Sequence, residues 1–176
     1  GCGNIGSIVA DRAKGLKMKV LVYDPFLTAE TSKDIGVEKV SFDELLKKSD
    51  IISIHTPLTN STRNIINSKN IYSIKKGSSI INCARGGLID ENSLSEALKN
   101  NHLSGAAIDV FEEEPYTGNL SRIERCLLTS HMGSMSIDCR SRMEIEATEE
   151  VARFLADQPL ESTVPDEEYN NQCSRA

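Results

Sequence analysis

Short apolar runs alternate along the chain with longer stretches whose apolar residues recur at helical spacing. The runs rich in β-branched residues predict strands at about 19–24, 50–55, 79–83, 106–110 and 126–129. The longer stretches predict helices at about 4–16, 91–100 and 137–156. Because strands and helices alternate and the strand runs are apolar throughout, we expect a doubly wound α/β domain whose parallel sheet is covered on both faces.

Local signals set some of the boundaries. Ser41 followed by Glu44 forms a capping box, which predicts a helix start just before Leu45. Gly15 is predicted to cap the first helix, and Pro25 is predicted to end the first strand.

A glycine motif opens the first helix. Gly1, Gly3 and Gly6 form a GxGxxG pattern, and Asp24 ends the next predicted strand. Such glycines permit a tight turn, close approach of a pyrophosphate and close helix packing, while the acidic residue binds ribose hydroxyls. The pattern predicts a Rossmann-type fold that binds NAD in preference to NADP, because Asp24 would repel a 2′-phosphate. The fingerprint normally follows a strand, so we expect this sheet to lack its first strand.

Composition narrows the class of protein. The chain has 176 residues, of which 39% are hydrophobic and 26% charged, and its net charge is −6. This acidity argues against a nucleic-acid partner, and the short apolar runs predict neither a signal peptide nor a membrane span. The cysteines have no metal-binding spacing, so we expect free thiols, no metal and a cytoplasmic location. They are Cys2, Cys83, Cys126, Cys139 and Cys173.

Polar segments follow the strands at the edge where open α/β sheets bind ligands. These segments are 55–62, 82–90, 109–115 and 129–134. Together they resemble, in order and spacing over about residues 1–155, the D-2-hydroxyacid dehydrogenases. The resemblance implies that Arg85, Glu114 and His131 are catalytic.

The chemistry of these residue types suits a 2-hydroxy acid. Arg85 can bind the substrate carboxylate with its planar fork, which Lys lacks. His131 can exchange the hydroxyl proton while hydride passes to or from the nicotinamide. Glu114, paired with His131, would orient the ring and favour its protonated form.

The resemblance also implies cofactor contacts beyond the glycines and Asp24. Backbone amides of Asn4 and Ile5 would bind the pyrophosphate, and Asp109 would hold the nicotinamide carboxamide. The other residues implied to flank the cofactor are Thr56, Pro57, Cys83, Ala84 and Gly133. His55 is expected to flank the cofactor loop without chemistry.

One residue departs from the family pattern. Ser130 stands where the family usually has proline before the catalytic histidine. Proline would stiffen that turn, so serine is expected to loosen the position of His131 without removing a catalytic group.

The domain prediction is an NAD-binding domain at 1–157 and a return segment with a loose tail at 158–176, with the substrate domain absent. The predicted function is NAD-dependent oxidation of a small D-2-hydroxy acid, or reduction of the 2-keto acid, in a manner similar to the phosphoglycerate branch. Two alternatives stay open: a transcriptional corepressor-type member that senses NAD, and an inert fragment of the enzyme. The resemblance also implies a homodimer formed through the NAD-binding domain.

Overall fold

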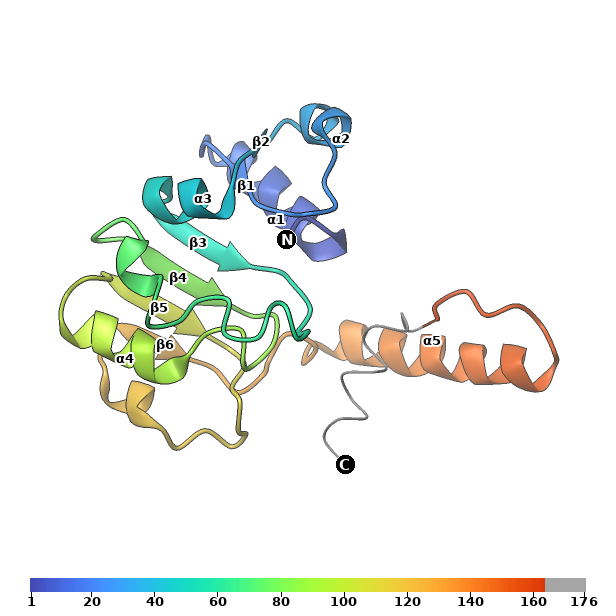
Figure 1. Ribbon diagram of the computed structural model, residues 1–176. Helices are drawn as coiled ribbons and strands as arrows, with labels where there is room; N and C mark the ends of the chain where they lie inside the picture. The colour runs from blue at the N-terminus through green and yellow to red at the C-terminus, as the bar shows by residue number, and fades with distance from the viewer. Residues whose placement is uncertain (164–176) are drawn as a thin grey trace. The chain divides into compact units, whose positions relative to one another are not determined.

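The computed structural model describes residues 1–163 and divides the chain into two compact units, Gly1–Ser130 and a second that begins at His131 (Figure 1). The helices of the first unit are α1 (Asn4–Gly15), α2 (Ala29–Asp34), α3 (Phe42–Lys48) and α4 (Glu91–Lys99), with the 3₁₀ helices η1 (Ile71–Ser73) and η2 (Asn119–Arg122). Its strands are β1 (Leu21–Val22), β2 (Glu38–Lys39), β3 (Ile51–Ile54), β4 (Ser79–Asn82), β5 (Gly105–Ile108) and β6 (Cys126–Leu128).

The strands form two parallel sheets. The larger has the order β3-β4-β5-β6, and the smaller pairs β1 with β2. Register is continuous across the larger sheet: Ile54 pairs with Asn82, which pairs with Ile108. The carboxyl ends of its strands therefore meet at one edge, which confirms the predicted parallel α/β architecture.

The connections within the four-stranded sheet agree with the prediction of one helix among these strands, at about 91–100. Of the three connections within the four-stranded sheet, the one from β4 to β5 contains an α-helix, α4. The connections from β3 to β4 and from β5 to β6 contain the 3₁₀ helices η1 and η2. Helix α2 and strand β2 were not predicted, since both are short and β2 is exposed at both residues.

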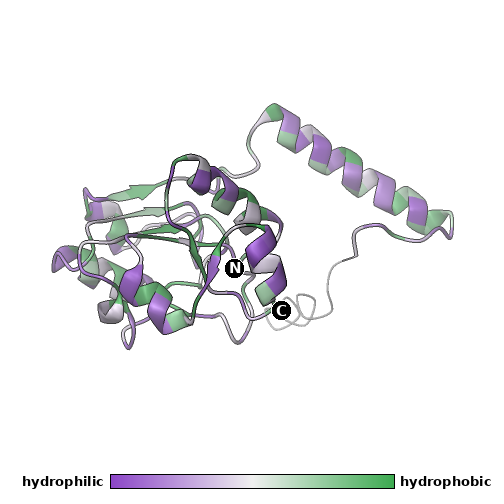
Figure 2. Ribbon diagram, turned by 90° about the horizontal axis from the view of Figure 1, so that it is seen from above, coloured by the Kyte–Doolittle hydropathy of each residue, from purple (hydrophilic) through white to green (hydrophobic). Residues whose placement is uncertain are grey.

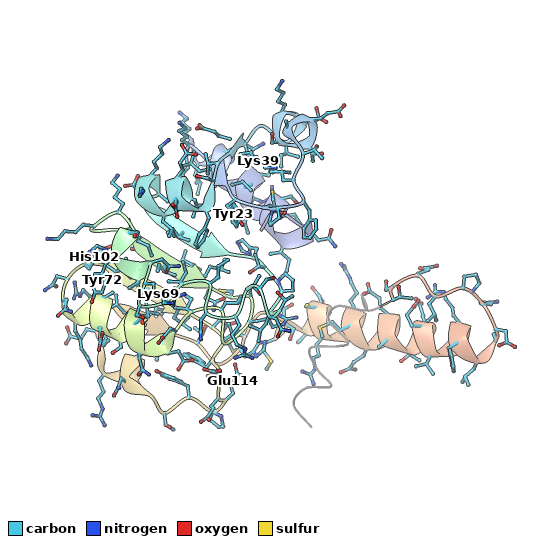
Figure 3. All side chains as sticks on the ribbon, in the orientation of Figure 1. Tyr23, Lys39, Lys69, Tyr72, His102 and Glu114 are labelled. Carbon is cyan, nitrogen blue, oxygen red and sulfur yellow. The ribbon has the colours of Figure 1, made fainter. Side chains whose placement is uncertain are left out.

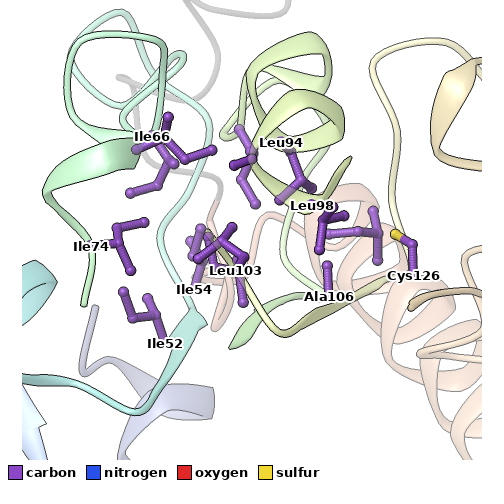
Figure 4. Packing of buried hydrophobic residues seen from close by; sticks show 14 of the residues in the cluster. Ile52, Ile54, Ile66, Ile74, Leu94, Leu98, Leu103, Ala106 and Cys126 are labelled. Carbon is purple, nitrogen blue, oxygen red and sulfur yellow. The ribbon is translucent and has the colours of Figure 1, made fainter. Parts of the chain in front are cut away.

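The core of the first unit lies between the four-stranded sheet and α4 (Figure 4). Leu94 and Leu98 are four residues apart, so they share one face of α4, and each is at most 1% exposed. They pack in one cluster with Ile80 of β4 and Ile108 of β5. Burial of such side chains stabilises the fold by roughly 1.5–3 kcal/mol each.

Helix starts agree with the sequence better than helix ends do. The Ser41 hydroxyl accepts a hydrogen bond from the Glu44 N–H, and Glu44 reaches back to the Ser41 N–H, which confirms the capping box. The prediction that Gly15 caps α1 is wrong: Gly15 is the last helical residue and Leu16 follows as the cap. The residue with a left-handed backbone conformation after the end of α1 is instead Lys17, at φ 60°.

Burial of the sheet is one-sided within the first unit. Inward residues alternate with exposed or half-exposed ones along β3, β4 and β5. Ile51 and Leu127, on β3 and β6, are 47% and 65% exposed. The apolar face of α1 is also open, with Ile5 and Ile8 more than half exposed. The expected cover on both faces is therefore not found within this unit.

The second unit contains one long helix, α5 (Ile137–Leu155), close to the predicted 137–156. Ser136 caps its start by accepting a hydrogen bond from the Cys139 N–H. None of its residues is buried, and Figure 2 shows hydrophobic and hydrophilic residues mixed along its length. Most of the predicted loose tail, including Cys173, lies outside the described residues.

Within residues 1–163, no helix is long and apolar enough to cross a membrane. The four described cysteines are free thiols, and no group of acidic, His and Cys side chains there could hold a metal ion.

Candidate active site

Most predicted site residues of the first unit lie in the turns that follow its parallel strands. Asp24 follows β1, Thr56 follows β3, and Cys83 to Arg85 follow β4. Asp109 follows β5 directly. Since adjacent strands are in register, the structure brings the turns after β3, β4 and β5 to one edge of the sheet.

Of the three motif glycines, Gly1 and Gly6 are tightly packed, whereas Gly3 has open space around it. A side chain on Gly1 would stand 2.6 Å from the His55 carbonyl oxygen, and one on Gly6 would overlap the Gly1 carbonyl. A side chain on Gly3, in contrast, would meet nothing within 4 Å. Gly3 is also the N-cap of α1 and supplies no side-chain cap. The first amides of α1, among them those of Asn4 and Ile5, therefore begin beside an open surface suited to a phosphate.

Asp24 joins the glycine loop to the end of β1. Its carboxylate accepts hydrogen bonds from the Cys2 N–H at 2.7 Å and from the Phe26 N–H at 2.8 Å. Partial burial acts to raise the pKa of Asp24, but these hydrogen bonds, with a further one from the Leu27 N–H, outweigh it and lower the pKa below its ordinary value. Asp24 is therefore an ionised acceptor beside the loop, as its predicted ribose contact requires.

The turn after β3 contains a buried polar atom without a partner among the described residues. The Thr56 hydroxyl oxygen is buried and makes no hydrogen bond there. Pro57 lies next to it, and its carbonyl accepts a hydrogen bond from the Thr62 hydroxyl at 2.7 Å. The His55 ring bonds to the Ser53 hydroxyl at 2.8 Å, while burial lowers the pKa of His55. An unpaired buried hydroxyl is costly, so Thr56 is suited to contact a polar ligand.

Arg85 stands on a turn shaped by Asn82. The Asn82 side chain, 2% exposed, accepts a hydrogen bond from the Ala84 N–H and donates one to the Arg85 carbonyl. Arg85 itself is exposed, and its guanidinium donates to the Ala84 carbonyl at 2.6 Å. The turn is held by hydrogen bonds to the buried Asn82 side chain, while its cationic end reaches solvent, where it can bind an anion.

The turns that carry Arg85 and Glu114 pack directly on each other. Gly86 lies against the Phe111 backbone so closely that any side chain would overlap the Phe111 carbonyl. Glu114 accepts a hydrogen bond from the Phe111 N–H at 3.0 Å, which folds its turn back on itself. Figure 3 shows Glu114 on the segment that follows β5. Gly86 thus lets two turns that carry opposite charges approach at backbone distance.

Asp109 directly follows β5 and is 6% exposed. The Thr129 hydroxyl donates to it at 2.5 Å. Cys83 lies in the neighbouring turn. The residue as a whole is exposed, but its thiol is partly buried, and this burial together with the Asp109 charge raises the pKa of the thiol. Asp109 therefore has the buried, hydrogen-bonded character expected of a carboxylate that positions a ligand.

His131 and Gly133 belong to the second unit, and both are exposed. His131 adopts a left-handed backbone conformation at φ 54°, directly after Ser130. The predicted pairing of Glu114 with His131 stays a prediction, because the two residues lie in different units.

Three residues that shape the site were not assigned a role from the sequence: Asn82, Gly86 and Thr129. Asn82 and Gly86 lie inside the recognised segment 82–90, so the segment signalled their importance. Their roles depend on contacts with Arg85 and Phe111 that spacing alone does not reveal.

Comparison with known proteins settles the family. The model of the D-isomer specific 2-hydroxyacid dehydrogenase, NAD binding domain, matches residues 1–133. The chain belongs to this family. The D-3-phosphoglycerate dehydrogenase of Bacillus subtilis (strain 168) is 45% identical over 165 residues, which are 93% of this chain and 31% of that enzyme.

Solved structures of similar proteins support the same family. The holo form of D-mandelate dehydrogenase from Rhodotorula graminis matches with a TM-score of 0.85 and 34% identity, over 93% of this chain and 49% of the other. D-lactate dehydrogenase with NAD+ from Lactobacillus jensenii matches with a TM-score of 0.82 and 27% identity, over 93% and 53%. The chain therefore spans between about a third and a half of these relatives.

The residues present fit the cofactor named in the family description. The open side of Gly3 leaves room for a pyrophosphate, and the unpartnered Thr56 hydroxyl offers a polar contact. Asp24 supplies the ionised acceptor for a ribose. The prediction from the sequence and the description of the family both give the dinucleotide NAD as the cofactor.

Proposed function

We propose that this chain is the cofactor-binding part of an NAD-dependent oxidoreductase that acts on a small D-2-hydroxy acid or its 2-keto form. The observation that carries the proposal is the edge where Asp24 and Thr56 follow parallel strands next to the glycine loop, beside the turns of Arg85 and Glu114. Such an edge is where open α/β sheets bind dinucleotides. Family membership supports the same activity.

The residue roles follow from charge and position. Asp24 would bind the adenosine ribose, while Gly3, Asn4 and Ile5 would receive the pyrophosphate at the start of α1. When bound, the nicotinamide would accept or supply the hydride. Thr56, Pro57, Cys83, Ala84 and Gly133 would flank the cofactor, and Asp109 would hold its carboxamide.

The substrate would be bound by Arg85 through its carboxylate, since the exposed guanidinium offers a planar, two-pronged donor. His131 would take the hydroxyl proton in oxidation and return it in reduction. Glu114 would orient the His131 ring and stabilise its charged form. The phosphoglycerate branch is the first substrate class to test, because the Bacillus relative is a D-3-phosphoglycerate dehydrogenase.

We also propose that the protein works as a cytoplasmic homodimer joined through its NAD-binding domain, taken as residues 1–157 with a return segment after it. The free thiols support a reducing compartment. The exposed apolar residues Ile5 and Ile8 on α1 support a partner surface in this domain.

The test is turnover of 3-phosphoglycerate, lactate and glycerate with NAD, followed by absorbance of the reduced cofactor. The protein that carries this chain should turn over at least one acid, and its Arg85→Ala variant should lose that turnover while keeping NADH binding. Saturable NADH binding without turnover of any acid, together with peptide binding, would favour the corepressor-type sensor instead.

A further inference from the structure

A hydrogen bond joins the ends of two neighbouring strands beside the predicted cofactor site. The Thr129 hydroxyl, directly after β6, donates to Oδ1 of Asp109, directly after β5, with 2.5 Å between the oxygens. Asp109 is 6% exposed. A carboxylate this deeply buried needs hydrogen-bond donors to keep its charge, so this hydroxyl bears directly on its conformation.

The backbones of both residues are fixed by the sheet. The Thr129 N–H donates to the Ile108 carbonyl, and the Asp109 N–H donates to the Asn82 carbonyl, each at 3.0 Å. With both main chains held, the hydroxyl-to-carboxylate bond favours one orientation of the Asp109 side chain. Hydrogen bonds to a charged group are among the stronger ones in proteins, strong enough to favour one rotamer over its alternatives.

We propose that Thr129 is a positioning residue that orients the Asp109 carboxylate for the nicotinamide carboxamide. The inference rests on the proposed function, which assigns that carboxamide to Asp109. A carboxylate offers about four acceptor positions, so Asp109 can accept the Thr129 hydroxyl and a carboxamide N–H together. Thr129 then governs affinity for the nicotinamide half of the dinucleotide. The adenosine half depends on the glycine loop and Asp24.

The two halves can be titrated separately. NADH contains both, whereas ADP-ribose lacks the nicotinamide. Thr129→Val removes the hydroxyl at nearly constant shape, and Thr129→Ser keeps the donor. We expect Thr129→Val to weaken NADH binding about tenfold, as loss of one such bond predicts. Its affinity for ADP-ribose should equal that of the unmodified protein, and Thr129→Ser should restore NADH binding to within about twofold.

A double-mutant cycle tests whether Thr129 acts through Asp109. In an Asp109→Asn background, Thr129→Val should weaken NADH binding by much less than tenfold, because the carboxylate it orients is gone. Equal tenfold losses in both backgrounds would overturn the inference.

The remaining outcomes separate the two proposals. Unchanged NADH affinity in Thr129→Val, with saturable binding by the unmodified protein, overturns the inference and leaves the proposed function intact. Parallel loss of NADH and ADP-ribose would show a general structural role and overturn it as well. Failure of the unmodified protein to bind either ligand would contradict the proposed function itself.

Discussion

The nucleotide half of the site and the half that carries Arg85 are stabilised in the same way, but they expose different groups to a ligand. In the nucleotide half, Gly1 packs on the His55 backbone and Asp24 accepts the Cys2 N–H. In the half that carries Arg85, Gly86 packs on the Phe111 backbone and Asn82 bonds the turn that follows it. Each half therefore combines a glycine at a backbone contact with one polar side chain that holds a turn.

The difference lies in what each turn presents to a ligand. The glycine loop presents backbone, with open space around Gly3. The other half presents charged side chains, because Arg85 and Glu114 are both exposed while their turns are fixed. Changes of shape should therefore impair the nucleotide half, and changes of charge should impair the half that carries Arg85.

Gly86→Ala should have the largest effect, on stability. The new methyl group would overlap the Phe111 carbonyl, so the two turns must separate, at a cost of about 4 kcal/mol. Urea unfolding followed by circular dichroism measures the change. Gly3→Ala is the matched control, because its methyl meets nothing within 4 Å; as the N-cap of α1, it should lose at most about 1 kcal/mol, the cost of alanine in place of glycine at such a position. Equal losses in both variants would refute the comparison.

Arg85→Ala should have the next largest effect, on catalysis. Losing two charge-assisted hydrogen bonds to a carboxylate should remove about 3 kcal/mol of transition-state stabilisation, which lowers kcat/KM by roughly a hundredfold. Arg85→Lys should recover only part of this loss, because an ammonium group cannot form the two-pronged contact. Steady-state kinetics in the direction of 2-keto acid reduction provide the measurement. A variant with near-normal kcat/KM would remove Arg85 from the mechanism.

Asp24→Ala should shift cofactor selectivity by about tenfold toward NADPH, because it removes both a ribose acceptor and the charge that repels a 2′-phosphate. Titrations with NADH and NADPH measure the ratio. Asp11→Ala, an exposed change on α1 that removes an equal charge, is the control and should leave the ratio unchanged. A similar ratio in Asp24→Ala and the unmodified protein would count against the ribose assignment.

The smallest effect concerns pH. Burial lowers the pKa of His55 below its ordinary 6.5. Between about 6.5 and the lower pKa of the folded state, the unfolded chain binds a proton that the folded protein does not. The free energy of unfolding should therefore fall as the pH decreases through this window. His55→Asn should flatten this slope in urea unfolding at several pH values, and an identical slope would contradict the assignment.

Much of the sheet could be predicted because its strands have strong apolar runs. The predicted range 50–55 contains β3, and 79–83 contains β4. The sequence does not reveal α2, whose start depends on Thr28 capping the Thr31 N–H, or β2, which has no apolar signature. Motifs in the sequence were enough to select Arg85 and Asp24 as candidate site residues. The contacts of Gly86 and Thr129 join residues about twenty positions apart or more, which no local pattern encodes.

The central claim is that this edge binds NAD, and calorimetric titration with NADH, with NADPH as the control, tests it most directly. The account predicts saturable NADH binding at about micromolar Kd and weaker NADPH binding, because Asp24 is ionised beside the glycine loop. Absence of saturable NADH binding by a folded protein, or equal affinity for NADPH, would contradict it.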